Sequence, residues 1–193
     1  MVKTKVSTEN SLVPYITKKG TGDKGTKVIF KMNKVSINKN MHLSEHFTLG
    51  EVTKTSVKTA DGNIPSHVAI ENLKNLCENW LEELRENYNL IYEGVGARDD
   101  NPIIITSGYR SPEVNKAVGG APTSNHLTGC AVDIRCAGIE QALRYACILL
   151  DIADGTKRDY DELFIERSKQ GRYWVHFAVR PKENRRKTAF IQT

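Results

Sequence analysis

With 193 residues, of which 39% are hydrophobic, the chain suits one domain with a real core and some residues to spare. No run approaches the roughly 18 apolar residues of a membrane span, and the N-terminus has neither the apolar stretch nor the cleavage site of a classical secretory signal. The formal charge is +5, and the four cysteines form no CxxC pair, which argues against a cysteine-based structural zinc site and favours reduced thiols.

The basic residues gather at the two ends of the chain. Residues 1–40 hold nine lysines against two acidic residues, a net charge of +7, and residues 180–193 carry +4, which leaves −6 for residues 41–179. We predict a basic N-terminal arm over 1–40, whose order the pattern does not fix, a compact domain over 41–180 and a basic tail over 181–193. Such ends could contact an anionic polymer, although charge runs more often form a solvated arm or tail.

The compact part begins with the clearest element, a helix over residues 66–88. Ser66 is a plausible N-cap, and apolar side chains then recur at helical spacing. A short buried strand is expected at 103–107, ending in a glycine turn. After this turn, Ser111 caps a short second helix with Pro112 in its first position.

The C-terminal half combines strands with one more helix. Residues 130–136 alternate as a strand does, and 141–151 form a helix for which we expect Leu143, Cys147 and Leu150 to face inward. DELFIE and YWVHFAV then predict two strands, joined by the polar RSKQGR in an antiparallel hairpin. Helices kept apart from a small antiparallel sheet predict an α+β domain.

A loop and strand with the sequence SNHLTGCAVD place His126 and Asp133 seven positions apart. In an extended run Asp133 can face a cleft while Val132 packs the core. His176 in YWVHFAV is a third candidate ligand, and three protein ligands would leave one position of a zinc ion open for water. Each piece alone is more often structural: the His–Asp spacing occurs by chance, and a strand histidine is usually a core residue.

Three other histidines are rivals for a metal. His42 and His46 are four positions apart, which would suit a metal if they lay on a helix. The segment SEHFTL, however, precedes the main helices and is typical of a docking loop. We therefore expect structural or exposed roles for these two and for His67.

A zinc peptidase also needs a carboxylate that is not a ligand, because a proton must pass from the attacking water to the leaving amine. Glu166 ends the strand before the hairpin and can converge with His176 across the ladder. A salt bridge to Arg167 or Arg172 at the hairpin mouth is an equally weighted alternative for it. Glu162 lies nearer the far end of the same strand.

Arg110 follows the turn TSGY. Its guanidinium could grip a substrate carboxylate or a developing oxyanion with two donors. The alternative is a surface arginine beside a helix N-terminus, which is an unfavourable place for a cation.

Taken in order, SGYRSPEVNKAVGG, SNHLTGCAVDI, YDELFIE and YWVHFAV resemble the peptidoglycan-cleaving branch of the M15 zinc peptidases, from about Leu43 through Arg180. That family has the α+β fold shared by D-alanyl-D-alanine carboxypeptidases and the Hedgehog signalling domain. The resemblance implies a Zn²⁺ ion bound by His126, Asp133 and His176.

The resemblance also implies substrate contacts for Arg110 and Ser124. Several family members carry the catalytic acid three residues before the last histidine, where this chain has Tyr173. A second pattern, shared with Hedgehog-like domains, has a glutamate at the end of the preceding strand, which corresponds to Glu166. Cys130 replaces a long basic residue of the family, with little expected consequence because it faces away from Asp133.

We therefore expect a zinc-dependent peptidase that hydrolyses peptide bonds in peptidoglycan stem peptides, of D-Ala-D-Ala carboxypeptidase or endopeptidase type, for example a phage lysin. The alternative is a non-catalytic zinc-binding module that binds the cell wall or forms part of a phage virion. The expected partners are peptidoglycan peptides and, in the phage setting, virion proteins, but not nucleic acid as a substrate. Made in the cytoplasm without a classical signal, such a protein would reach the wall through a holin or within a virion. The motifs leave open which bond is cut.

Overall fold

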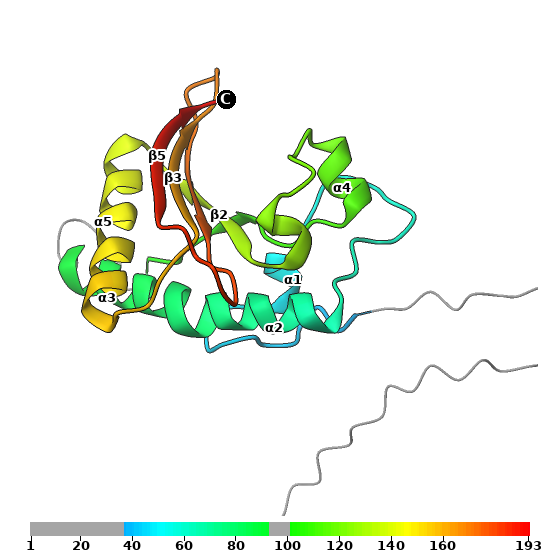
Figure 1. Cartoon of the computed structure of the whole chain (residues 1–193), viewed down its shortest axis with the longest axis horizontal. Coiled ribbons are helices and arrows are strands. Elements are labelled where there is room, and N and C mark those ends of the chain that lie inside the picture. The colour runs from blue at the N-terminus through cyan, green and yellow to red at the C-terminus, as the bar shows by residue number, and fades with distance from the viewer. Residues whose placement is uncertain (1–36, 93–100) are drawn as a thin grey trace, which may run out of the picture. The chain divides into compact units, whose positions relative to one another are not determined.

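A five-stranded mixed sheet in the order β1-β2-β4-β3-β5 forms the centre of the computed structural model, which describes residues 37–92 and 101–193 (Figure 1). The first four strands in that order pair antiparallel, and β5 adds to β3 in parallel. The strands are β1 (Ile105–Ser107), β2 (Ala131–Cys136), β3 (Glu162–Arg167), β4 (Tyr173–Ala178) and β5 (Lys187–Gln192). The predicted α+β class is confirmed, with a mixed sheet in place of an antiparallel one. Most of the predicted arm lies outside the described residues.

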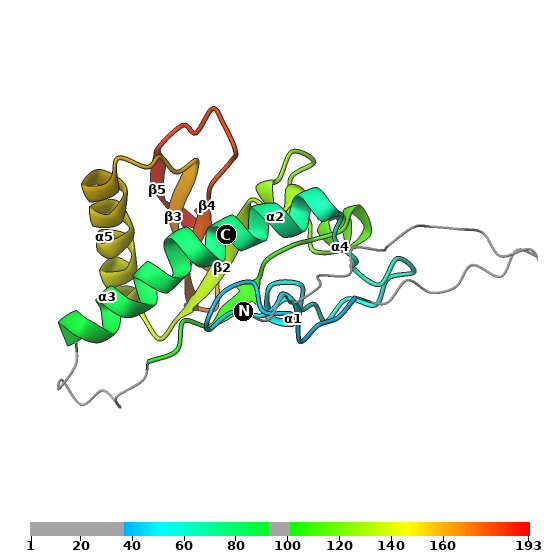
Figure 2. The same ribbon diagram turned by 90° about the horizontal axis from the view of Figure 1, so that it is seen from below.

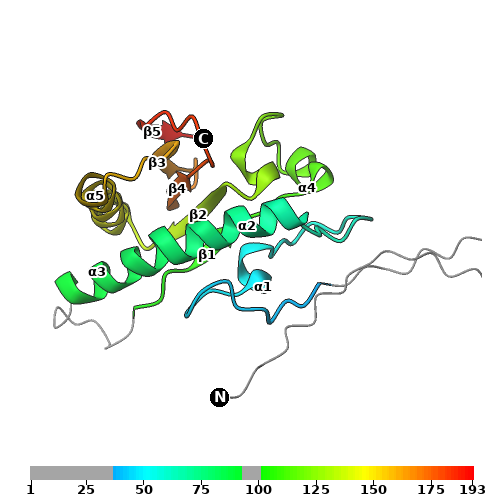
Figure 3. The ribbon, with the colours of Figure 1, turned by 60° about the horizontal axis from the view of Figure 1, so that its bottom comes forward.

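Helices lie to both sides of this sheet. They are α1 (Leu49–Val52), α2 (His67–Leu76), the π-helical turn η1 (Cys77–Leu81), α3 (Glu82–Tyr92), α4 (Pro112–Ala117), the 3-10 turn η2 (Asn125–Thr128) and α5 (Ile139–Thr156). α5 lies against one face of the sheet, and α4 lies on the opposite side (Figures 1 and 3). Within the described ranges, no helix is long and apolar enough to cross a membrane.

The predicted helix over 66–88 is confirmed and continues to Tyr92. Ser66 is its N-cap, since the Ser66 side chain accepts a hydrogen bond from a backbone N–H of the first turn. η1 joins α2 to α3 without a break, so that the three segments form one rod (Figure 2). Trp80 of η1 is buried, with its ring 5.0 Å from that of Phe177 in β4, and it thereby fixes the rod to the sheet.

The shorter elements also follow the sequence pattern. β1 occupies the end of the strand expected at 103–107, and β2 matches the expected strand within one residue. The Ser111 side chain caps α4, and Pro112 is the first residue of that helix. The expected hairpin is formed by β3 and β4.

The sheet separates an apolar face from a polar one. Val132 and Ile134 of β2 are completely buried in the core, as is Val175 of β4. Because side chains alternate along a strand, Asp133 and His176 lie on the opposite face. α5 covers the apolar face, and the polar face is available for a site.

The inward face of α5 differs from the prediction. Leu143 is 42% exposed and Cys147 is also exposed, whereas Tyr145 and Leu149 are buried. The buried stripe instead carries small alanines beside Tyr145, whose ring contacts that of Tyr88 on α3 at 4.8 Å. Of the three residues expected to face inward, only Leu150 packs against the core, and it does so partly buried.

Part of the basic tail predicted over 181–193 belongs to the sheet. Residues 187–192 form β5, in register with the whole of β3. Arg186 is held by Asp154 at 2.6 Å and Asp159 at 3.1 Å, so its charge is paired with carboxylates of the domain. A local charge run could not reveal these acidic partners, which lie more than twenty residues away in the sequence.

Gly129 shapes the entry to β2. It ends η2 with a φ of 72°, in the left-handed region, and a Cβ placed there would lie only 2.3 Å from the Ala69 carbonyl oxygen. A side chain is therefore excluded both by its conformation and by the close approach of α2.

We expect Gly129→Ala to destabilise the protein by about 2 kcal/mol or more, which corresponds to a fall of roughly 4–8 °C in Tm. Gly155→Ala is the matched control, because a Cβ at this position in α5 meets nothing within 4 Å and alanine favours helix. Thermal unfolding followed by circular dichroism should give an unchanged or higher Tm for the control. Equal Tm values for the two variants would contradict this account of the turn.

Candidate metal centre and active site

Three buried side chains converge on the polar face of the sheet. Asp133 of β2 lies directly opposite His176 of β4 in the antiparallel ladder, and η2 brings His126 beside them. One ligand atom from each residue lies within 4.8 Å of the others. The structure thus brings together the three residues that the sequence suggests as metal ligands, although their role as ligands stays a prediction.

The hydrogen bonds of the two imidazoles point a nitrogen of each toward Asp133. His126 Nδ1 donates to the carbonyl oxygen of Gly108 at 2.6 Å, and its Nε2 lies 3.3 Å from Asp133 Oδ1. His176 Nε2 lies 3.3 Å from a Glu162 carboxylate oxygen, and its Nδ1 lies 2.9 Å from Asp133 Oδ1. Two imidazole nitrogens and one carboxylate oxygen that meet in this way fit a zinc ion, as does the second partner of each ring.

Neighbouring charges and hydrogen bonds shift the pKa values of Asp133 and His176 strongly. Burial disfavours the charged form of Asp133, but the charge and hydrogen bond of His126, followed by those of His176, lower the pKa of Asp133 well below its usual range. Burial likewise opposes protonation of His176, yet its hydrogen bonds to Asp133 and Glu162 raise the pKa of His176 to about 9. A cation between these residues would replace the proton on His176 as the positive partner of Asp133.

Arg110 holds the second oxygen of Asp133. Its Nη2 donates to Asp133 Oδ2 at 2.5 Å, and its Nε donates to Ser107 Oγ at 2.8 Å. The Oδ1 atom of Asp133 is therefore left to face the two histidines. Ser124 caps η2, since its hydroxyl accepts a hydrogen bond from the His126 backbone N–H at 3.4 Å. Both residues therefore contact candidate ligands, and the substrate contacts expected of them stay predictions.

The turn that carries Arg110 is fixed by Asn63, a residue that the sequence did not single out. The buried Asn63 amide donates to the carbonyl oxygens of Thr53 and Tyr109, and its oxygen accepts from the Ser111 N–H at 2.7 Å. Asn63 lies in a loop more than forty residues before the turn, and no spacing pattern connects the two. That Asn63 fixes this turn can be seen only in the folded structure.

Two glutamates of β3 lie on either side of the place where Phe164 stacks on His176, the third candidate ligand. Phe164 lies opposite His176 in the ladder and its ring stacks on the imidazole, with centroids 5.5 Å apart. Glu162 and Glu166 are two residues to either side of Phe164, and hence on the same face. Glu162 contacts His176 even though it is nearer the far end of the strand, a contact that the sequence did not indicate.

The two glutamates have opposite electrostatic environments. Burial, followed by the nearby charge of Asp133, raises the pKa of Glu166. The hydrogen bond with His176 lowers the pKa of Glu162, against a smaller effect of burial. Glu166 is thus suited to gain and lose a proton, whereas Glu162 stays ionised.

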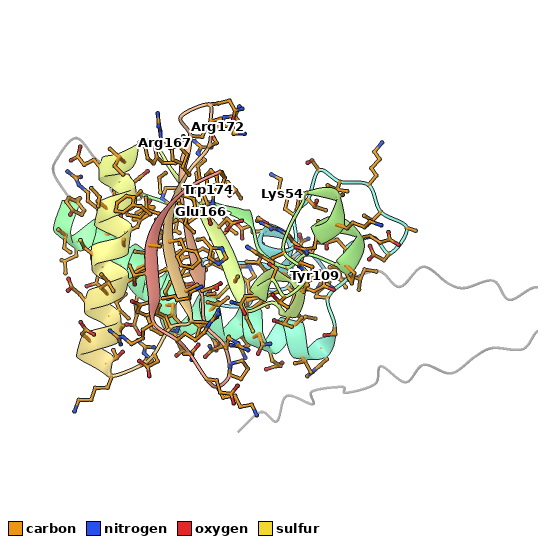
Figure 4. The ribbon with its side chains drawn as sticks, turned by 45° about the horizontal axis from the view of Figure 1, so that its top comes forward. Lys54, Tyr109, Glu166, Arg167, Arg172 and Trp174 are labelled. Carbon is orange, nitrogen blue, oxygen red and sulfur yellow. The ribbon has the colours of Figure 1, made fainter. Side chains whose placement is uncertain are left out.

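Glu166 is not used in the alternative salt bridge. Among the described residues it forms no ion pair with Arg167 or Arg172. Figure 4 shows Glu166 beside Trp174 on the sheet, with the two arginines toward the end of the hairpin. Because neither arginine neutralises it, the Glu166 carboxylate is available for proton transfer.

A pocket adjoins the candidate centre on the side of α4. Its volume is about 180 Å³, and Lys54, Ser107, Tyr109 and Arg110 are among the residues that line it. In Figure 4, Lys54 lies across from the sheet residues Glu166 and Trp174. A larger hollow of about 510 Å³ lies near His46 and α3, and contains none of the candidate site residues.

The rival histidines take no part in the centre. His46 is tied to Glu82 through its backbone N–H at 2.7 Å and its Nδ1 at 2.8 Å. His42 and His67 are exposed. The structural or exposed roles expected for these three residues are confirmed.

Replacing His126 with alanine should abolish metal binding, because the remaining two donors form an incomplete site. After reconstitution with zinc and dialysis, elemental analysis should give about one equivalent for the unchanged protein and close to none for His126→Ala. His67→Ala removes an exposed histidine and serves as the control, with the metal content of the unchanged protein. Normal metal content in His126→Ala would refute its assignment.

The relationship of the chain to known proteins agrees with this geometry. The family model described as Peptidase M15 matches residues 45–154, which is more than half of the chain. The matched range contains His126 and Asp133, together with the turn that carries Arg110. No curated protein sequence matches the chain. The chain belongs to the M15 peptidase family.

Proposed function

We propose that the protein is a zinc-dependent peptidase that hydrolyses peptide bonds in peptidoglycan stem peptides, as a D-Ala-D-Ala carboxypeptidase or an endopeptidase. The observation that carries the proposal is the convergence of His126, Asp133 and His176 on the polar face of the sheet, with Glu166 on the same face. Membership of the M15 peptidases supports the reaction class.

His126, Asp133 and His176 would hold the ion. Zinc, when bound, supplies a Lewis acid for the scissile carbonyl and lowers the pKa of a bound water. Arg110 keeps Asp133 oriented toward the histidines through the 2.5 Å contact with Oδ2. The carbonyl of Gly108 does the same for the ring of His126.

Glu166 is the residue to which we assign the proton transfers. Its half-buried carboxylate accepts a proton from the attacking water and returns it to the nitrogen of the leaving amine. Tyr173, three residues before His176, pairs with Arg167 on the apolar side of the ladder and packs against the core. That side faces away from the candidate ligands, which supports Glu166 as the catalytic carboxylate.

The pocket beside Arg110 supports an anionic peptide as the substrate. Lys54 and Arg110 line it together with hydroxyl-bearing side chains, so that a carboxylate of a stem peptide would find both charge and hydrogen-bond donors there. Ser124 lies at the start of η2, next to the candidate ligands, and is assigned a further substrate contact. The part of the peptide that binds in this pocket would determine which bond is cleaved.

Glu166→Gln should leave zinc bound and reduce cleavage by about 10²–10⁴-fold or more, because the amide cannot accept and return the proton. Glu71→Gln, an exposed change on α2, is the control and should cleave normally. Purified cell walls provide the substrate, and new free amino groups, measured with and without a chelator, provide the readout. Mass spectrometry of the released muropeptides identifies the bond.

Two outcomes would contradict this proposal in different ways. An active Glu166→Gln enzyme would remove Glu166 from the reaction while leaving the peptidase assignment in place. Absence of any chelator-sensitive release by the unchanged protein would overturn the peptidoglycan peptidase itself.

A further inference from the structure

A buried carboxylate, that of Asp161, is linked by shared partners to Glu162 of the candidate site. Asp161 is completely shielded from solvent, yet it keeps a charged side chain. Arg185, in the connection between β4 and β5, donates from Nε to Asp161 Oδ1 at 2.7 Å and from Nη2 to Oδ2 at 2.6 Å. Because a buried charge is tolerated only when it is well paired, Asp161 fixes the guanidinium of Arg185 in one place.

The same guanidinium also reaches a residue of the site. Arg185 Nη2 lies 2.7 Å from Glu162 Oε1. The side-chain amide of Asn125 donates both to Asp161 Oδ2 at 2.7 Å and to Glu162 Oε2 at 2.9 Å. Both oxygens of Glu162 are thereby held, and its Oε2 is the atom that contacts His176 Nε2.

This network can act on both imidazoles. Asn125 directly precedes His126 within η2, and Glu162 contacts His176 on the side opposite Asp133. A carboxylate that accepts from the second nitrogen of a ligating histidine fixes the tautomer and the orientation of the ring. Glu162 therefore determines which nitrogen of His176 faces Asp133.

We propose that Arg185 is a positioning residue, which acts through Glu162 to hold His176 in its metal-binding orientation. The inference rests on the proposed metal-dependent function and adds the C-terminal segment to the parts that build the centre. The alternative is that Arg185 only fastens β5 to the domain. Arg186 has that simpler role, since its partners Asp154 and Asp159 make no contact with the candidate ligands.

The neighbouring arginines provide a matched pair for the test. Arg185→Ala and Arg186→Ala each remove one charge and contacts to two carboxylates from the same connection. Zinc affinity is measured by competition with a chelating dye, and the visible spectrum of the cobalt-substituted protein reports the ligand geometry. We expect Arg185→Ala to weaken zinc binding by about 10–100-fold and to change the cobalt spectrum. Arg186→Ala should bind both metals as the unchanged protein does.

A double-mutant cycle tests whether Arg185 acts through Glu162. Glu162→Ala should weaken zinc binding at least as much as Arg185→Ala, and the double variant should be no weaker than Glu162→Ala alone. Additive losses would overturn the proposed route. Should Arg185→Ala fail to fold, Glu162→Ala decides, since unchanged zinc affinity in that variant overturns the proposal.

The outcome also separates this inference from the proposed function. Equal zinc affinities for Arg185→Ala and Arg186→Ala, beside normal binding by the unchanged protein, would overturn only the positioning role. Failure of the unchanged protein to bind zinc would overturn the metal centre and the positioning role together.

Discussion

The carboxylate of Asp133 is the group on which the whole site depends. One of its oxygens faces nitrogens of His126 and His176, and the other accepts a hydrogen bond from Arg110. A buried anion is stable only while such partners stay in place, and here they come from η2, β4 and the turn after β1. Several parts of the fold hold these partners of Asp133 in place. The ladder aligns β2 with β4, Gly129 allows η2 to lie close to α2, and Asn63 fixes the turn that carries Arg110.

Features set by local periodicity could be predicted from the sequence. The long helix, the β3–β4 hairpin and the alternation that separates Asp133 from Val132 all follow from spacings of two or of about four residues. The short motif around His126 was too weak by itself to indicate a metal site, and the three candidate ligands were suggested by the order of four motifs that resemble those of a known family. That Asp133 and His176 face each other in the ladder could not be predicted, since register between distant strands depends on the packed core.

Features set by long-range partners were missed for related reasons. On α5, the buried Tyr145 contacts Tyr88 of α3. β5 depends on backbone pairing with β3, and the arginines that precede it depend on acidic partners. The contact of Glu162 with His176 also escaped prediction, because the position of a residue along a strand does not reveal how far its side chain reaches. In each case the deciding partner lies far away in the sequence.

The register of the two central strands has a consequence for how the protein opens. Asp133 and His176 sit on β2 and β4, which have neighbours on both sides within the sheet, so that separating these side chains requires the middle of the sheet to come apart. Such strands open only with global unfolding, unlike loops that fluctuate singly. An ion held between these side chains would add its binding free energy to the stability of the entire domain, because only the folded sheet brings Asp133 and His176 together.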